Sequence, residues 1–339
     1  MPQAERGARR ALAAWFPERA DEVRLEPLGE GHINDTWLVR MPGQRLVLQR
    51  INGAVFPDPL GIARKVAAVT AHLRGRVALA PLLTSRAGVP WHEASDGVWR
   101  MTRFVPGRTL QTLASDAQAE AAGCAFGRFQ RALAGLSADL LAEPIPGFLR
   151  LDHYLAELDA ALARAPAGGS AIGEAVALIE RRRHLAGTFA DADRPIHGDC
   201  KVNNLLFQRH RDRVVGVLDL DTVMVGHWAW DFGDLVRSAA TGARFSVARF
   251  AALARGFVGA ARVPADVQTL IEAPRYLALM LSVRFLTDHL CGDRYFKVAE
   301  RGENLARAWT QLDVLRDMEG REAQMVAALA GIGELRRRR

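Results

Sequence analysis

The feature that most constrains this chain is a polar motif at residues 197–204, HGDCKVNN, followed by a second acidic segment, LDLD, at residues 218–221. The apolar run at residues 214–218 is typical of a buried strand. The apolar LLF that follows the motif predicts a second short strand, and a polar turn separates the two. We therefore expect a β-hairpin that brings Asp199 and Asp219 close together at one end.

The residue types in these segments are those that phosphoryl transfer requires. Such a reaction needs in-line positioning and neutralisation of charge on the transferred group more than covalent catalysis. Asp199 can accept the proton of an attacking hydroxyl, and Lys201 can contact the moving phosphate. Asn204 and Asp219 offer the hard oxygen ligands that Mg²⁺ prefers. The plainer alternative is a polar turn in which Asp199 only accepts hydrogen bonds from backbone N–H groups.

The motif at residues 197–204, Asp219 and the DFGD segment at residues 231–234 resemble the aminoglycoside phosphotransferase and choline kinase superfamily. Other segments are similar to its N-acetylhexosamine 1-kinase-like branch, namely residues 31–36, 47–52, 218–237, 284–288 and 292–296. The resemblance extends from about residue 28 to about residue 305. It implies an α+β, two-lobed, protein-kinase-like fold. Such a fold has a small antiparallel β-sheet N-lobe with one main helix, and a mostly helical C-lobe that carries the catalytic β-hairpin.

A break at Val105-Pro106-Gly107 predicts a hinge within residues 103–107. We expect a nucleotide-binding lobe at residues 1–104 and a helical lobe with the catalytic loop and acceptor site at residues 105–335. Hydrophobic periodicity predicts small-lobe strands at residues 23–28, 36–40, 45–51, 81–85 and 98–104, with helices at 8–16 and 60–74. In the second lobe it predicts helices at residues 117–133, 151–163, 172–186, 231–241, 247–261, 266–289 and 304–329.

The nucleotide site is predicted from the first lobe and the hinge. Gly29 and Gly31 lie in the loop between the first two predicted strands, where the resemblance implies that the backbone covers the phosphates. An ordinary hairpin turn is the alternative. Arg103 and Val105, at the hinge, are the remaining predicted contacts to the nucleotide outside the third strand.

The third strand departs from the pattern of the superfamily. Kinases of this fold carry a lysine there for the α- and β-phosphates, but this position is Gln49, and the first lysine of the chain is Lys65 on a predicted helix. That helix also lacks the usual glutamate. Strand alternation places Gln49 and Arg50 on opposite faces. We expect Gln49 to occupy the lysine position, with Lys201 and Mg²⁺ neutralising most of the phosphate charge. One alternative is that Arg50 binds the phosphates, and a second alternative is that the nucleotide site is weak or inactive.

A set of polar residues is predicted to contact the acceptor or the transferred phosphate: His32, Asn34, Asp221, Arg237, Arg284, Asp288 and Tyr295. Arg284 and Asp288 are four residues apart on a predicted helix, so an ordinary surface ion pair is their alternative reading. His197 and Asp231 are expected to brace the catalytic loop through hydrogen bonds.

Composition limits the other classes of function. The net charge is +7, yet the arginines are spread along the chain and no basic segment is interleaved with aromatic residues, so we predict no nucleic-acid partner. No apolar run is long enough for a membrane span and no secretory signal is visible. The 3 cysteines lack metal-ligand spacing and indicate a reducing cytoplasm. The oligomeric state, monomer or homodimer, is left open.

The predicted function is an ATP- and Mg²⁺-dependent kinase that phosphorylates the anomeric hydroxyl of an N-acetylhexosamine. A kinase of the same fold for an aminoglycoside, choline, homoserine or another sugar is the first alternative. The chain shows no concentrated acidic segment for a polycation and is poor in the tyrosine that a choline cage needs. A non-catalytic nucleotide-binding regulator is the second alternative, and the intact Asp199 and Asn204 argue against it.

Overall fold

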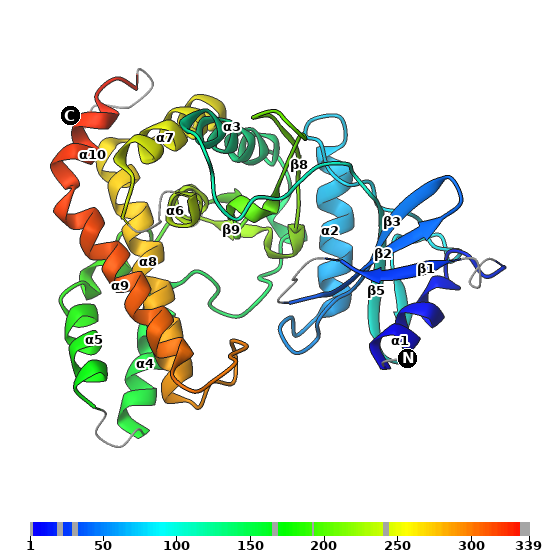
Figure 1. Ribbon diagram of the computed structural model, residues 1–339, viewed down its shortest axis with the longest axis horizontal. Coiled ribbons are helices and arrows are strands. Elements are labelled where there is room, and N and C mark those ends of the chain that lie inside the picture. The colour runs from blue at the N-terminus through cyan, green and yellow to red at the C-terminus, as the bar shows by residue number, and fades with distance from the viewer. Residues whose placement is uncertain are drawn as a thin grey trace.

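The computed structural model describes residues 3–18, 23–28, 33–164, 169–191, 193–239 and 244–332. The protein has two lobes, a small one built on a β-sheet and a larger, mostly helical one (Figure 1). This arrangement confirms the predicted α+β fold with a sheet-containing N-lobe and a helical C-lobe. Among the described residues, no helix is long and apolar enough to cross a membrane.

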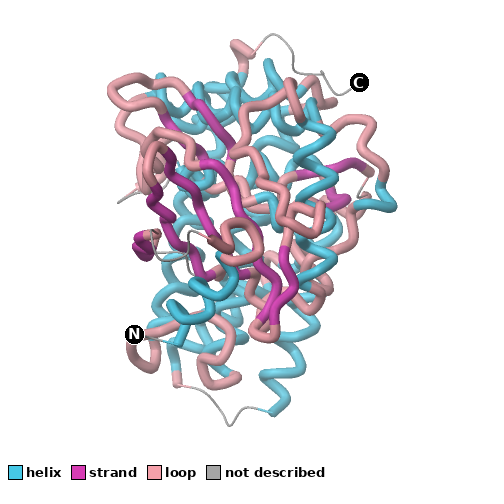
Figure 2. Tube along the Cα trace, turned by 90° about the vertical axis from the view of Figure 1, so that its right-hand side faces the viewer, coloured by secondary structure: helices cyan, strands magenta, loops and turns pink. Residues whose placement is uncertain are grey.

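The small-lobe sheet has 5 antiparallel strands in the order β1-β2-β3-β5-β4, and it faces the viewer in Figure 2. Its strands are β1 (Arg24–Pro27), β2 (Asp35–Met41), β3 (Gln44–Arg50), β4 (His92–Ala94) and β5 (Gly97–Arg103). Alternate side chains, including Trp37, Leu48 and Trp99, pack with Leu12 of helix α1 (Gln3–Leu12) in a small apolar core. The opposite side chains of the same strands are therefore directed towards α2 and the large lobe.

Helix α2 (Pro59–Leu73) is the main helix of the small lobe. It begins after Asp58, whose side chain accepts a hydrogen bond from the backbone N–H of Gly61 at 2.8 Å, and proline at the first helical position suits this start. Its apolar stripe, which includes Ile62, Val66 and Val69, is buried in the core that continues into the large lobe. The helix therefore lies between the sheet and the catalytic region (Figure 1).

Three predicted elements were wrong. The helix predicted at residues 172–186 ends at Glu180 and is followed by a separate short 3-10 turn. Residues 81–85 form no strand but only a single bridge, between Leu82 and Thr102. The first residues of β5 pair instead with β4, a strand that the sequence did not predict. Leu82 therefore meets β5 only near the other end of that strand. Residues 304–329 form two helices rather than one, α9 (Glu303–Gly320) and α10 (Glu322–Leu329). Glycine at the end of α9 favours this interruption because it stabilises helix poorly.

The chain passes from the sheet to the catalytic hairpin within a few residues. The backbone N–H of Phe104 donates to the carbonyl of Arg45 in β3, and Arg108 exchanges two backbone hydrogen bonds with Phe207. The segment between them contains the predicted hinge. The division into lobes at residues 1–104 and 105–335 stays a prediction.

The large lobe surrounds two short sheets with helices. Strand β6 (Arg194–Ile196) pairs with β9 (Met224–Gly226), and β7 (Leu205–Phe207) pairs with β8 (Val214–Val217). The second pair is the predicted hairpin. The remaining helices are α3 (Asp116–Ala132), α4 (Leu151–Arg164), α5 (Ser170–Glu180), α6 (Trp228–Ala239), α7 (Val247–Ala261) and α8 (Val267–Leu290).

Candidate active site

The catalytic loop is held by His197, which is completely buried between β6 and the loop. Its Nε2 lies 3.0 Å from the carbonyl oxygen of Leu218, and its Nδ1 accepts the backbone N–H of Asp199. This pattern fixes the tautomer with hydrogen on Nε2. The rings of Phe126 and Phe129 contact the imidazole edge-on. His197 therefore joins the two ends of the catalytic hairpin, and both ring nitrogens are engaged in this bracing.

Asp231, at the start of α6, holds the loop from the other side. Its carboxylate accepts the backbone N–H groups of His197 and Gly198 at 2.9 and 2.8 Å. Gly198 has φ of 80°, and a Cβ there would lie 2.5 Å from the carbonyl oxygen of Thr222. The glycine is therefore required by both backbone conformation and space. Burial raises the pKa of Asp231, while the hydrogen bonds from the backbone N–H groups of His197 and Gly198 oppose the rise.

The predicted base Asp199 is in contact with the predicted catalytic Lys201 and the predicted metal ligand Asn204. One oxygen of its carboxylate lies 2.9 Å from Lys201 Nζ, and the other accepts a hydrogen bond of 2.7 Å from Asn204 Nδ2. Burial alone would raise the pKa of Asp199, but the Lys201 charge and these hydrogen bonds hold it below its ordinary value. The carboxylate is therefore ionised at neutral pH and able to accept a proton.

Asp219 follows β8 and has a left-handed backbone, with φ of 57°. Its side chain is exposed at the surface of the site, yet the surrounding protein limits its hydration and raises its pKa to about 7. The charges of Asp221 and Asp199 act in the same direction. The two predicted neighbours, Asp199 and Asp219, thus lie close enough to repel each other, as the hairpin predicted.

This acidic end fits a divalent cation. Among the described residues Asp219 forms no side-chain hydrogen bond and no salt bridge, although the charges of Arg100 and Lys201 lie near it. The amide nitrogen of Asn204 donates to Asp199, which leaves the amide oxygen of Asn204 available. No cluster of three His, Cys, Asp or Glu side chains in the described ranges could hold a metal alone. A cation here would need water and substrate oxygens as well, which is the usual coordination of Mg²⁺.

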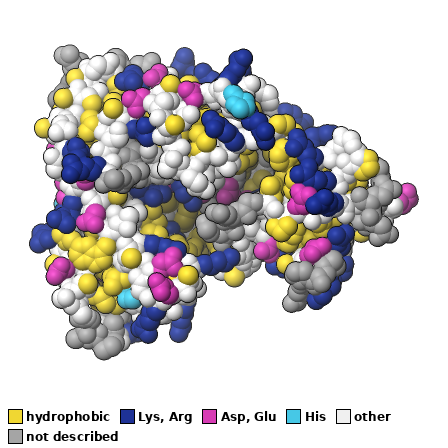
Figure 3. Space-filling model, in the orientation of Figure 1, with side chains coloured by type: hydrophobic (Ala, Val, Ile, Leu, Met, Phe, Trp, Pro, Cys, Tyr) yellow, Lys and Arg dark blue, Asp and Glu magenta, His cyan; other side chains and the backbone are white. Residues whose placement is uncertain are grey.

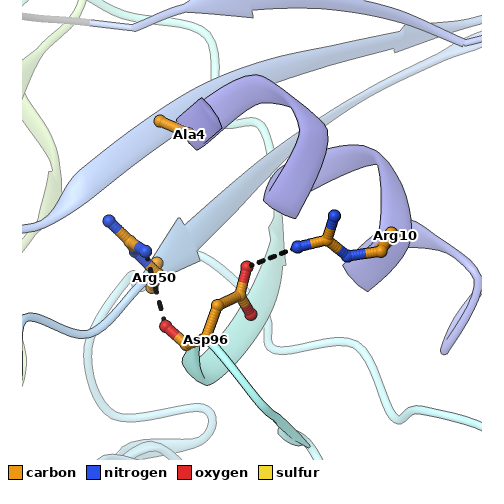
Figure 4. A pocket seen from close by; sticks show the side chains of 4 residues that line it. All are labelled: Ala4, Arg10, Arg50 and Asp96. Atoms are coloured by element: carbon orange, nitrogen blue, oxygen red, sulfur yellow. Dashed lines mark hydrogen bonds and ion pairs between the residues drawn. The ribbon is translucent and has the colours of Figure 1, made fainter. Parts of the chain in front are cut away.

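The structure confirms that Gln49 and Arg50 lie on opposite faces of β3. Arg50 is directed to the α1 side, where it pairs with Asp35 and donates to the carbonyl of Asp96 at 3.4 Å. Figure 4 shows this side of the sheet, with Arg10 of α1 and Arg50 both turned towards Asp96 around a small surface pocket. Gln49 is directed to the α2 side, where Thr36 accepts its amide hydrogen.

The sequence did not single out Arg100, which is buried on β5 directly opposite Gln49. Its Nε donates to Gln49 Oε1 at 3.0 Å, and its two terminal nitrogens both bind the carboxylate of Asp221. Asp221 also accepts a 2.7 Å hydrogen bond from Asn34 Nδ2. The signal was a charged residue within the apolar run Val-Trp-Arg-Met of β5, which needs a partner if the strand is central.

Lys65 adds a second buried cation near Asp221. The side chain lies on α2, is 4% exposed and donates from Nζ to the carbonyl of Ala142 at 3.1 Å. Burial lowers its pKa to about 8, although the charge of Asp221 opposes the change. The usual strand-lysine and helix-glutamate pair is thus absent, and two cations from the small lobe approach an aspartate of the large lobe instead.

The predicted acceptor residues fall into separate groups. Arg237 pairs with the buried Asp234 on α6 at 2.7 Å, and the charge of Asp234 helps to raise the pKa of Lys201, after the larger effect of Asp199. Arg237 therefore lies beside the catalytic pair. Arg284 lies on another helix, α8, and forms a second group with Asp288 and Tyr295.

Arg284 lies among four aromatic rings, with its guanidinium carbon 4.8 to 5.8 Å from their centroids: Phe148, Tyr154, Tyr295 and Phe296. The ion pair between Arg284 and Asp288, which was the alternative reading of their spacing, is not formed within the described part of the chain. The buried Asp288 instead accepts backbone N–H groups of residues 294–296 and the amide of Asn304. Asp288 therefore folds the loop that carries Tyr295 against Arg284.

Three predicted contacts, Gly29, Gly31 and His32, lie outside the described residues. Arg103 is exposed at the end of β5, and Val105 is half-buried just after it. Figure 3 shows the surface hollowed between the two lobes, with acidic, basic and hydrophobic side chains along the hollow. The roles assigned to the individual site residues stay predictions.

Comparisons with known proteins agree with this geometry. The model of the Phosphotransferase enzyme family matches residues 24–265. An aminoglycoside phosphotransferase solved with GDP and kanamycin is similar over 93% of this chain and 98% of its own, with 17% identity and a TM-score of 0.64. A choline/ethanolamine kinase family protein from Mesorhizobium loti matches 96% of this chain and 98% of its own, with 18% identity and a TM-score of 0.59.

An amicoumacin kinase solved with AMP-PNP, Ca²⁺ and its antibiotic covers 92% of this chain and 96% of its own, with 14% identity and a TM-score of 0.60. At such identities these structures establish the fold, whereas the family match extends over most of the chain, including the catalytic hairpin. The chain belongs to the phosphotransferase enzyme family and is an ATP-dependent phosphotransferase that acts on a hydroxyl group.

Proposed function

We propose that this enzyme transfers the γ-phosphate of ATP to the anomeric hydroxyl of an N-acetylhexosamine. The observation that carries the chemistry is the arrangement of Asp199 between Lys201 and Asn204. The hydroxyl oxygen forms a bond to the γ-phosphorus while the bond from that phosphorus to the β–γ bridging oxygen breaks. Asp199 accepts the hydroxyl proton, and ADP leaves. Lys201 and the phosphate it contacts remain paired through the transfer.

Asn204 and Asp219 would hold Mg²⁺ in this site. When bound, the ion supplies positive charge that neutralises the phosphate oxygens of the nucleotide. Within the described part of the chain, the amide oxygen of Asn204 accepts no hydrogen bond and the carboxylate of Asp219 forms no hydrogen bond or salt bridge, which supports this assignment. The protein contributes the fixed positions of both groups, because Asn204 immediately precedes β7, Asp219 follows β8, and the two strands pair with each other.

The choice of a sugar rests on the character of the Arg284 region. A guanidinium surrounded by aromatic rings can donate hydrogen bonds to carbonyl and hydroxyl oxygens, while a ring such as that of Tyr295, 47% exposed, can stack on a sugar face. Arg237 provides a second cation near Lys201. Such a surface disfavours a polycationic aminoglycoside, which needs carboxylates. The similarity to N-acetylhexosamine 1-kinase-like segments at residues 284–288 and 292–296 supports the same choice.

Related folds accept chemically diverse alcohols, since those compared above include enzymes solved with kanamycin and with amicoumacin. A kinase for another sugar, choline, homoserine or an aminoglycoside is therefore the competing reading. The deciding experiment is ADP release from purified enzyme with ATP and Mg²⁺ over a panel of these alcohols. We expect N-acetylglucosamine or N-acetylgalactosamine to give the largest kcat/KM.

Two controls separate the acceptor from the chemistry. The methyl glycoside of the preferred sugar lacks the anomeric hydroxyl and should give no ADP above background, while phosphorus NMR of the product should show an anomeric phosphate. Asp199→Asn should remove turnover for every acceptor. Equal turnover with the methyl glycoside would show that another hydroxyl is phosphorylated, and preference for kanamycin or choline would replace the sugar assignment.

A further inference from the structure

The small lobe lacks the strand lysine that binds nucleotide phosphates in kinases of this fold, and the structure offers a candidate substitute. Arg100 lies opposite Gln49 in the register of β3 and β5. Directly opposite residues of an antiparallel pair have their side chains on the same face. Arg100 therefore shares the face of the missing lysine, whereas Arg50 lies on the other face, against α1.

Three hydrogen bonds, to Gln49 and to both oxygens of Asp221, hold the Arg100 side chain in one orientation. Gln49 accepts from Nε, and the two oxygens of Asp221 accept from the two terminal nitrogens. A guanidinium has five N–H donors, so these bonds leave two without a partner among the described residues. Arg100 is 5% exposed and has the charge of Asp219 close by as well as that of Asp221. The free donors are thus fixed beside the acidic end of the catalytic hairpin.

We propose that Arg100 takes the place of the strand lysine and binds the phosphates nearest the nucleoside, with Gln49 and Asp221 as positioning residues. This inference rests on the ATP-dependent transfer proposed above. A guanidinium presents donors in a plane that matches phosphate oxygens. Gln49 at the lysine position is then explained, because it orients the arginine of the neighbouring strand. A lysine there would place a second cation against Arg100.

A purely structural role is the rival explanation. Arg100 and Asp221 come from different lobes, and the pair could serve only to hold the lobes together. The two roles predict different effects of an Arg100 substitution on the affinity for ligands that carry different numbers of phosphates. A phosphate ligand affects nucleotides and spares adenosine, while a lobe tether affects all ligands by the same factor.

The experiment is calorimetric titration of the full chain with adenosine, AMP, ADP and ATP in the presence of Mg²⁺. The variants are Arg100→Met, Arg100→Lys and the double change Arg100→Gln with Asp221→Asn, which removes both charges and leaves neither unpaired. Arg40→Met on β2 is the matched control, because Arg40 is exposed and pairs with Glu26. Melting temperatures without ligand report the structural cost of each change.

We expect Arg100→Met and the double variant to weaken ADP and ATP binding about 10- to 100-fold more than adenosine binding, as for loss of a charged hydrogen bond. Arg100→Lys should recover part of that difference. The double variant and Arg100→Lys carry the test if Arg100→Met does not fold. An unchanged ratio of ADP to adenosine affinity in the double variant would overturn the assignment of Arg100 alone. A wild-type protein that binds no nucleotide would overturn the proposed function as well.

Discussion

The buried Lys65 gives a quantitative prediction about stability. Its pKa falls from the ordinary lysine value of 10.5 to about 8. At ~1.36 kcal/mol per pH unit, the charged form is disfavoured in the folded protein by about 3 kcal/mol. Lys65→Met removes this cost but also the hydrogen bond to Ala142, worth about 1 kcal/mol. We expect the variant to be more stable than wild type at pH 7 by about 2 kcal/mol.

The sign of the pH dependence follows from linkage. Between pH 8 and pH 10.5 the unfolded chain keeps the Lys65 proton and the folded chain has lost it, so wild-type stability gains from this residue as pH rises. That contribution is fully present above pH 10.5 and is lost as pH falls through about 8. The stability advantage of Lys65→Met should therefore shrink steadily over this range.

Urea unfolding at several pH values between 7 and 10.5 measures the effect. The quantity of interest is the difference between wild type and variant, because burial raises the pKa of Tyr276 and Tyr154 in both proteins and alters both curves equally. Lys297→Met, at an exposed lysine, is the matched control and should give a constant difference near zero. Parallel curves for wild type and Lys65→Met would refute the argument that Lys65 is buried with a lowered pKa.

Three further outcomes are expected. Asp199→Asn should lower kcat about 10²- to 10⁴-fold with little change in ATP affinity, measured by ADP release and titration; near wild-type turnover would exclude Asp199 as the base. Asp219→Ala should weaken Mg²⁺-dependent nucleotide binding more than Asp221→Ala, which should mainly lower the melting temperature; the reverse order in titrations with and without Mg²⁺ would exchange their roles. Gly256→Ala should destabilise the large lobe by several kcal/mol in urea unfolding, because the new Cβ on α7 would lie 2.1 Å from the carbonyl oxygen of Glu120 on α3. Wild-type stability of this variant would show that α3 and α7 can move apart at no cost.

The catalytic hairpin could be predicted because its determinants are local. The strand and turn patterns around Asp199 and Asp219 fix which ends meet, and the structure has the same pairing. Alternation along β3 was also sufficient to place Gln49 and Arg50 on opposite faces. The family and fold followed from the motif for the same reason.

Other features depended on contacts between distant segments. Arg100 was missed because its importance comes from the register of β3 with β5 and from a contact with Asp221, which is 121 residues away in the chain. Asp288 was assigned to the acceptor from the resemblance to the family, yet its carboxylate binds the backbone of the loop that follows α8. Neither contact has a periodic signal in the sequence.

The charges at the lobe boundary suggest why two departures from the usual pattern occur together. A lysine on β3 and a glutamate on α2 would form an ion pair within the small lobe. Here α2 supplies Lys65 and β5 supplies Arg100, and the balancing carboxylate, Asp221, belongs to the large lobe. Removing one partner of a buried pair costs about 3–5 kcal/mol, because the other charge stays buried. Any lobe movement that separates Arg100 from Asp221 therefore needs another anion beside Arg100, and on our proposal the nucleotide phosphates supply it.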